Sequence, residues 1–231
     1  MPLAVIRQMP SVNFSDRKEG TEISILVMHY TGMKSGGEAL QRLCDPDAGV
    51  SAHYLIEEDG TVFQMVAEDK RAWHAGAGIW RGYGDVNSVS VGIEIVNPGH
   101  EFGYRPFPDR QMQSVLEISK AVIHRHKIKP FNVIAHSDMA PSRKADPGEL
   151  FNWRWLAENG IGFWPDMTSP IDKPLLALED SLKNIGYDIT DMEKTIAAFQ
   201  RRWRPEQVDG VADRQTTELA YMVQKEVRRL T

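Results

Sequence analysis

Short apolar runs and amphipathic segments alternate along the first two thirds of the chain. Residues 23–30 are β-branched and aliphatic, too few for a helix, and followed by Thr-Gly, so they are predicted to form a buried strand. A second apolar run predicts a strand at 132–136. Residues 89–97 alternate with the period of a strand. This places Glu94 on one face, where Gly92 leaves open space beside it, and the opposite face carries Val89, Val91, Ile93 and Ile95.

Helical spacing of apolar residues marks three further segments: 35–43, 108–127 and 153–159. Ser35 is the expected N-cap of the first of them. Residues 50–57 and 61–66 flank an Asp-Gly pair that tolerates positive φ, which indicates a β-hairpin. Strands and helices that alternate in this way predict an α/β fold with a central mixed β-sheet flanked by helices.

A proline-rich stretch separates this region from the end of the chain. Residues 166–174 show no apolar period and are predicted to be a linker. Beyond the linker, helical patterns cover 175–185, 191–203 and 213–227. The sequence therefore predicts a larger domain at 1–165 and a small C-terminal three-helix domain at 175–231.

The composition is that of an ordinary globular protein: of 231 residues, 42% are hydrophobic and 26% are charged. The formal net charge of −5 gives no electrostatic reason to expect a nucleic-acid partner. The single cysteine, Cys44, excludes an intramolecular disulfide and a cysteine-based zinc site. No stretch approaches the ~20 apolar residues that span a bilayer, so we expect no transmembrane segment. The oligomeric state stays open.

The first residues carry no recognisable export signal. Residues 1–7 have neither a long apolar region nor a small-residue cleavage site. We therefore expect a cytoplasmic protein. A periplasmic or outer-membrane-associated location is the alternative, if an export signal has been removed from this sequence.

Two apolar runs lead into a histidine, and an acidic residue follows the second. His29 follows the first run, His136 closes the other, and Asp146 comes ten residues later in a Pro/Gly loop. Imidazole nitrogens and carboxylate oxygens bind zinc, and three protein ligands leave the fourth tetrahedral position open for water. The pattern predicts a catalytic Zn²⁺ site. Taken alone, each residue has a commoner structural use, as a hydrogen-bonded histidine or a turn aspartate.

Two charged residues are candidates for the chemistry beside such a metal. Hydrolysis of an amide needs a base for the water and an acid for the leaving amine, and Glu94 is the candidate for both. Lys144 is the cation best placed in the sequence to stabilise negative charge on the carbonyl oxygen. The structural alternatives are an ion pair within the sheet for Glu94 and a solvated loop charge for Lys144.

The segment 136–148, His-Ser-Asp-Met-Ala-Pro-Ser-Arg-Lys-Ala-Asp-Pro-Gly, resembles the signature of zinc-dependent N-acetylmuramoyl-L-alanine amidases of the type 2 family. Within that family it is most similar to the bacterial anhydro-muropeptide amidases. Further matching segments are His29-Tyr30-Thr31, Ser51 to Ile56 with Asp59-Gly60, Ala72 to Gly76, and Asn87 to Glu94. The resemblance gives the five candidate residues the same roles and makes 1–165 the expected zinc amidase catalytic domain.

The C-terminal residues resemble the peptidoglycan-binding helical module. The matching positions are Leu182, Gly186-Tyr187, Thr195, Phe199-Gln200, Asp209-Gly210 and Thr216. Asp213-Arg214 stand where that module tends to have Gly-Pro. Sugar binding and a purely structural role of residues 175–231 both stay open.

The resemblance implies cleavage of the amide between N-acetylmuramic acid, or its 1,6-anhydro form, and L-alanine in peptidoglycan fragments, for cell-wall turnover or recycling. Expected substrate contacts are His74, Trp73 and His53, with Trp80 as a further aromatic surface; packing and support of the sheet are the alternatives. The competing functions are a non-catalytic peptidoglycan-recognition protein and a zinc amidase of other specificity. The sequence does not decide between polymeric peptidoglycan and a small muropeptide.

Overall fold

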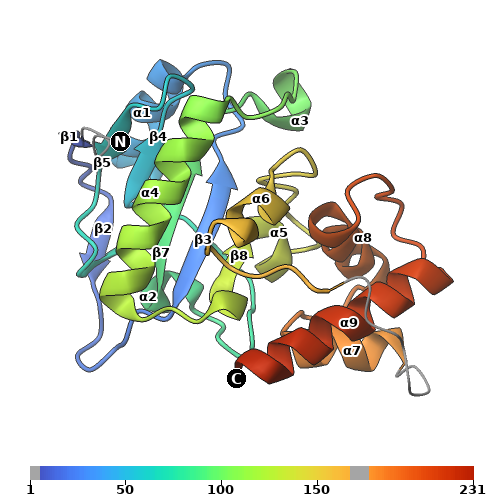
Figure 1. Ribbon diagram of the computed structural model, residues 1–231. Coiled ribbons are helices and arrows are strands. Elements are labelled where there is room, and N and C mark those ends of the chain that lie inside the picture. The colour runs from blue at the N-terminus through green and yellow to red at the C-terminus, as the bar shows by residue number, and fades with distance from the viewer. Residues whose placement is uncertain (1–5, 167–176) are drawn as a thin grey trace.

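A computed structural model describes residues 6–166 and 177–231 of the chain (Figure 1). Among these residues, a six-stranded sheet has the order β1-β5-β4-β7-β3-β8. Its strands are β1 (Ile6–Gln8), β3 (Ile25–Tyr30), β4 (Tyr54–Ile56), β5 (Val62–Gln64), β7 (Ser90–Ile95) and β8 (Val133–Ala135). The β4–β5 pair is antiparallel and the other pairs are parallel, so the mixed sheet expected from the sequence is confirmed.

The strand β3, which lies between β7 and β8, is buried on both faces, and this explains its unbroken apolar run. Leu26 and Met28 pack with the long helix α4 (Asp109–His126), which crosses one face of the sheet. Ile25 and Val27 point to the opposite face. Figure 1 shows α4 in front of the sheet, spanning most of its height.

The remaining elements of the larger region are short. A separate antiparallel pair joins β2 (Phe14–Asp16) to β6 (Lys70–Ala72). The helical elements are α1 (Gly36–Cys44), η1 (Pro46–Ala48), α2 (Val86–Val89), α3 (Gly99–Phe102), η2 (Pro130–Asn132), α5 (His136–Met139) and α6 (Trp153–Glu158). The strand expected at 132–136 is therefore shorter than predicted, because His136 begins α5 instead of ending β8.

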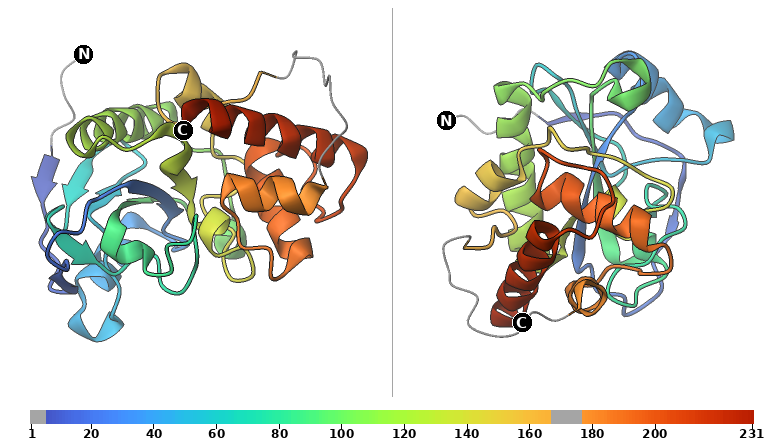
Figure 2. Two further views of the ribbon diagram at one scale, coloured as in Figure 1. Left: turned by 90° about the horizontal axis from the view of Figure 1, so that it is seen from below. Right: turned by 90° about the vertical axis from the view of Figure 1, so that its right-hand side faces the viewer.

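Three helices make up the end of the described chain: α7 (Leu178–Ile185), α8 (Met192–Trp203) and α9 (Arg214–Leu230). We call residues 177–231 the C-terminal helical unit. The unit lies beside the β8 edge of the sheet in both Figure 1 and Figure 2. Apart from Asp166, the expected linker falls outside the described residues.

The C-terminal helical unit shares a hydrophobic core with the sheet. One cluster of buried side chains includes Ile25, Val27 and Ile134 from the strands and Leu182, Phe199 and Val223 from the unit. The division into domains at 1–165 and 175–231 stays a prediction. The two parts are packed together through this shared core. Within the described residues, no helix is long and apolar enough to cross a membrane.

Candidate metal and catalytic site

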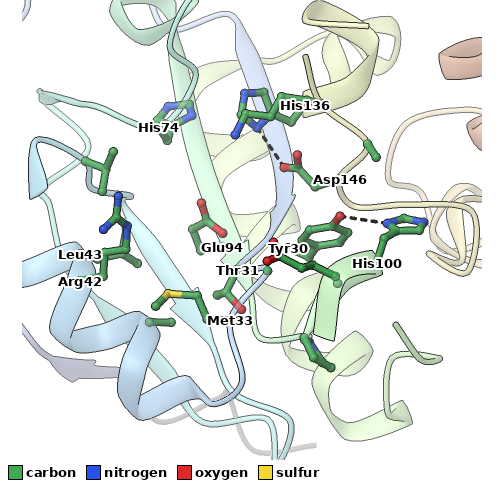
Figure 3. Close-up of a pocket in the computed structure, with 18 of the residues that line it drawn as sticks. Tyr30, Thr31, Met33, Arg42, Leu43, His74, Glu94, His100, His136 and Asp146 are labelled. Atoms are coloured by element: carbon green, nitrogen blue, oxygen red, sulfur yellow. Dashed lines mark hydrogen bonds and ion pairs between the residues drawn. The ribbon is translucent and has the colours of Figure 1, made fainter. Parts of the chain in front are cut away.

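Sheet register brings the main candidate residues to one place. β3 and β7 pair in parallel with His29 opposite Glu94, one residue before the carboxyl end of each strand. β8 pairs with the other side of β3, and the chain leaves it directly into His136. Sites in sheets of parallel strands gather at this edge, and a pocket of about 480 Å³ opens there (Figure 3).

The three expected metal ligands meet beside this pocket, and two of them, His136 and Asp146, line it. His29 Nδ1 lies 2.8 Å from His136 Nδ1, and Asp146 Oδ2 lies 3.2 Å from the first nitrogen and 2.9 Å from the second. All three side chains are buried. This cluster can hold a metal ion.

A chain of hydrogen bonds determines the tautomer of His29, that is, which ring nitrogen carries the proton. Ser90 donates its hydroxyl proton to the carbonyl of Val86 (2.6 Å), so its Oγ accepts from His74 Nε2 (3.2 Å). A neutral His74 then carries a lone pair on Nδ1, which accepts from His29 Nε2 at 3.0 Å. With its proton on Nε2, a neutral His29 turns the Nδ1 lone pair toward Asp146.

The tautomer of His136 is determined in the same way. His136 Nε2 donates to the carbonyl of Ala75 at 2.9 Å, which leaves Nδ1 of the neutral ring as an acceptor. Two imidazole lone pairs and a carboxylate oxygen therefore converge, and neutral rings leave no proton between them. A cation is the species that satisfies three such acceptors, and the backbone carbonyl behind His136 is a partner typical of metal-bound imidazoles.

The pKa shifts of His29 and Asp146 favour the protonation states that a metal needs. Burial is the main cause that lowers the pKa of His29 to about 4, and it also holds the pKa of His74 well below its usual value. Burial alone would raise the pKa of Asp146, but the His136 and His29 rings against it hold that pKa well below its usual value. Neutral His29 and ionised Asp146 are thus the forms present at neutral pH.

Glu94 faces the same pocket but has a different environment. Its Oε2 atom is buried and has no hydrogen-bond partner among the described residues, while the residue as a whole is partly exposed to the pocket. Burial raises the pKa of Glu94 well above its usual value; Asp146 adds to this and Lys144 opposes it. An unpartnered carboxylate with a raised pKa is suited to accept and return a proton.

Lys144 lines the pocket and is half-buried. Its charge acts on the pKa of both Glu94 and His29, so the ammonium lies near the base and the ligand cluster. The turn that carries it is held by its backbone N–H, which donates to the carbonyl of Ala140 at 2.9 Å. The structure therefore brings together all five residues that the sequence singled out for metal binding and catalysis, whose roles stay predictions.

The expected substrate contacts are placed less uniformly. His74 and Trp73 line the pocket, with His74 turned against His29. His53 is fully buried away from the pocket: its Nδ1 accepts from the Gly92 backbone N–H, and its Nε2 lies 3.1 Å from the Lys70 carbonyl. The structure thus does not bring His53 to the pocket.

The expectation for Trp80 is wrong. This residue is only 2% exposed, because its ring packs edge-to-face against Tyr187 of the C-terminal helical unit at 5.3 Å. Its ring N–H donates to Asn132 Oδ1 at 3.3 Å. Trp80 is a core residue and offers no surface to a sugar.

Some pocket residues were not found by the sequence reasoning. Tyr30 and His100 form one rim, with the Tyr30 hydroxyl 2.9 Å from His100 Nδ1 (Figure 3). Arg143 forms part of another wall and donates to the carbonyls of Ala75 and Ala77. Tyr30 follows His29 and Arg143 precedes Lys144 in the sequence, so their neighbours could have indicated them. His100 lies on the separate short helix α3, which no sequence pattern predicted.

Known proteins resemble this chain over most of its length. The chain is 36% identical over 228 residues to the N-acetylmuramoyl-L-alanine amidase AmiD of Escherichia coli, covering 86% of this chain and 81% of AmiD. It is 34% identical over 164 residues to the 1,6-anhydro-N-acetylmuramyl-L-alanine amidase AmpD of Enterobacter cloacae, covering 64% of this chain and 86% of AmpD.

Solved structures agree with these sequence relatives. AmiD from E. coli, in complex with the substrate anhydro-N-acetylmuramic acid-L-Ala-D-gamma-Glu-L-Lys, superimposes with a TM-score of 0.79 at 32% identity over 93% of this chain and 98% of AmiD. AmpDh3 from Pseudomonas aeruginosa superimposes with a TM-score of 0.81 at 28% identity, over 94% of this chain and 98% of the AmpDh3 chain. The fold and the relatives thus point to the same enzymes.

The family assignment rests on a match within the part of the chain that builds the pocket. Residues 19–149, more than half of the sequence, match the family model described as N-acetylmuramoyl-L-alanine amidase. This range contains β3, β7, β8 and all five candidate residues. The chain therefore belongs to the N-acetylmuramoyl-L-alanine amidase family, Amidase_2, and hydrolyses the amide bond between N-acetylmuramic acid and L-alanine.

Proposed function

We propose that this amidase depends on one Zn²⁺ ion held by His29 Nδ1, His136 Nδ1 and Asp146 Oδ2, and that its substrate is a 1,6-anhydro-muropeptide. The observation that carries the metal assignment is the convergence of these three acceptors, with both histidine Nε2 atoms already used as donors. Two imidazole nitrogens and one carboxylate oxygen are a donor set typical of catalytic zinc.

The bound metal would supply Lewis acidity to the scissile carbonyl and lower the pKa of a water molecule at the site. Glu94 accepts a proton from that water as its oxygen attacks the carbonyl carbon. Glu94 then returns the proton to the alanine nitrogen as the C–N bond breaks, so its carboxylate is regenerated. Lys144 stabilises the negative charge that develops on the carbonyl oxygen.

Relatives support the choice of a small substrate. The E. coli AmiD structure contains an anhydro-muropeptide, and the P. aeruginosa AmpDh3 has been solved with an anhydromuramic pentapeptide. The pocket of this chain is a local hollow at the sheet edge, rimmed by Tyr30 and His100. We therefore favour a soluble muropeptide over the polymer, and a role in peptidoglycan recycling.

A non-catalytic recognition protein is the alternative function. A protein that only binds peptidoglycan has no use for a buried carboxylate without a partner, because leaving such a group unpaired destabilises the fold. Glu94 Oε2 is such a group. The intact ligand cluster and Glu94 together favour catalysis.

Zinc content tests the metal assignment. Protein purified without a chelator is expected to contain close to one zinc per chain by elemental analysis, and His136→Ala is expected to lose both the zinc and the activity. His124→Ala, which changes an exposed histidine on α4, is the matched control. Full zinc retention by His136→Ala would remove this residue from the ligand set.

Fragment analysis tests the substrate. Purified enzyme is incubated with a 1,6-anhydro-muropeptide and, separately, with insoluble peptidoglycan, and the products are identified by mass spectrometry. We expect faster release of the peptide from the small substrate. We also expect the full-length protein to pellet only weakly with insoluble peptidoglycan if it works on soluble fragments in the cytoplasm. Preferred cleavage of the polymer, with strong pelleting, would instead indicate a wall-directed enzyme.

A further inference from the structure

A buried ion pair joins the metal-site helix α5 to the C-terminal helical unit. Asp138 on α5 is 0% exposed, and its Oδ2 accepts from Arg202 Nη1 of α8 at 2.7 Å. Its Oδ1 accepts from the hydroxyl of Tyr187, which follows α7, also at 2.7 Å. The mechanism proposed above uses none of these three residues.

Asp138 also holds the backbone that presents the metal ligands. Its Oδ2 accepts from the Ala135 N–H at 2.8 Å, at the point where β8 gives way to His136. The next residue, Ser137, donates its N–H to the carbonyl of Asp146 at 3.0 Å. The position of α5 therefore sets two of the three metal ligands, and Asp138 is the side chain that anchors α5.

Arg202 is itself held in a fixed orientation. Its guanidinium lies 4.2 Å from the centre of the Trp153 ring on α6 and 4.6 Å from that of Trp203. Arg202 is only 4% exposed. A guanidinium in contact with two indole rings has little freedom to follow Asp138 if α5 shifts.

Docking of the C-terminal helical unit does not need this ion pair. Apolar side chains already join the two parts, as in the contact between Trp80 and Tyr187 and the shared core around Ile134 and Phe199. Removing two charges from water costs about as much as their attraction returns, so a buried ion pair is a poor device for stability alone. Its directional contacts instead fix the place of the residue that carries them.

We propose that Asp138 is a positioning residue of the metal site, and that Arg202 and Tyr187 of the C-terminal helical unit hold it in place. The unit thereby contributes to zinc binding and turnover without touching the metal or the substrate. This inference rests on the metal ligation proposed above. It gives residues 177–231 a role inside the enzyme that is independent of any binding to the cell wall.

The test compares two buried arginines of the same unit in the full-length protein. Arg202→Met removes the contact to Asp138. Arg204→Met removes a contact within the unit, where Arg204 pairs with Asp213 at 2.6 Å, and leaves Asp138 untouched. Zinc affinity is measured by competition with a chromophoric chelator, kcat and KM at saturating zinc, and unfolding by urea.

We expect Arg202→Met to weaken zinc binding by about 10–100-fold, the usual loss when a group that orients a metal ligand is removed. At saturating zinc its kcat should fall more than its KM rises, because the rim of the pocket is unchanged. Arg204→Met should lower stability and leave the zinc dissociation constant unchanged. Equal losses of zinc affinity in both variants, or none in Arg202→Met, would overturn the proposal.

Tyr187→Phe provides a second, milder variant if Arg202→Met does not fold. It removes one hydroxyl and keeps the ion pair, so zinc affinity should fall by about 10-fold, the low end of the same range. Unchanged zinc affinity in Tyr187→Phe would then reject the inference. Wild-type protein is titrated alongside, because an absence of zinc binding by wild type would refute the proposed metal ligation itself. Wild-type binding that is retained in Arg202→Met and Tyr187→Phe would refute only the positioning role of Asp138.

Discussion

The metal-ligand cluster and Glu94 lie on adjacent elements of one sheet edge and are built in opposite ways. Behind the cluster, His29 donates to His74, His136 donates to Ala75, and the backbone of Asp146 is held by Ser137. Glu94 is opposite His29 in the β3–β7 register, yet its Oε2 has no partner among the described residues. The far side of each ligand is therefore held by a hydrogen bond, whereas Glu94 Oε2 is left without one.

This contrast follows from what each group has to do. A metal ligand must present one atom at a fixed place, so a partner on its far side is useful. A proton-transfer group must gain and lose a proton during each turnover, and a permanent donor to its carboxylate would lower its pKa and compete with the water. Burial without a partner raises the pKa of Glu94. Substitutions at Glu94 should therefore affect turnover without affecting zinc binding, and substitutions behind the ligands should affect zinc binding first.

Glu94→Gln should give the largest effect that leaves the ligand cluster intact. The amide has the size of the carboxylate but cannot take a proton, so we expect kcat to fall about 10²–10⁴-fold while zinc content and fold persist. Single-turnover rates and elemental analysis measure the two quantities. The control is Glu101→Gln, which changes an exposed residue that also lines the pocket. Near wild-type turnover by Glu94→Gln would assign the base to another residue and remove the contrast between Glu94 and the ligand cluster.

Lys144→Ala should have the next largest effect. A cation aimed at charge that exists mainly in the transition state contributes roughly 2–4 kcal/mol there, so kcat should fall far more than KM rises. Lys144→Arg keeps the charge and should recover part of the loss. Steady-state kinetics on one small muropeptide separates the two constants. A change confined to KM would make Lys144 a substrate anchor.

Much of the fold could be predicted because its central elements carry strong local signals. The apolar run of β3 reflects burial on both faces, and Ser35 caps α1 by accepting from the Glu38 N–H as expected. The strands β1 and β2 were missed, since they are three residues long and largely exposed. Short edge strands carry almost no hydrophobic pattern to detect.

The sequence predicted those site residues that lie at the ends of strands. It did not predict the contacts between segments that are far apart in the chain. His74 packs against Gly92, and a Cβ at that glycine would lie only 2.4 Å from the imidazole ring. The sequence indicated open space beside Glu94 and could not show that His74 fills it. The Asp138–Arg202 pair is 64 residues apart, beyond the reach of any local pattern.

His74→Gln tests whether the hydrogen bonds behind the cluster matter for metal binding. Loss of the ring that orients His29 should weaken zinc affinity by about 10–100-fold, as for other partners of metal-bound imidazoles. Turnover at saturating zinc should be less affected than in Glu94→Gln. Chelator competition measures the affinity, with His124→Gln as the control. Unchanged zinc affinity together with a raised KM would return His74 to the substrate contacts expected from the sequence.

The smallest effect concerns stability, at the histidine that lies away from the pocket. Burial is the main cause that lowers the pKa of His53 to about 4. Between pH about 6.5 and about 4, the unfolded chain therefore binds a proton that the folded protein does not, so stability falls as the pH falls through this window.

The expected loss from this one residue is about 2 kcal/mol between about pH 7.5 and about pH 5. Urea unfolding of metal-free protein at these two values measures it. His53→Asn does not titrate and can still accept from the Gly92 N–H, so its stability should depend less on pH while the contributions of His29 and His74 cancel in the comparison. Parallel pH dependences for the two proteins would mean that His53 titrates alike in the folded and unfolded states, contrary to its burial beneath the sheet.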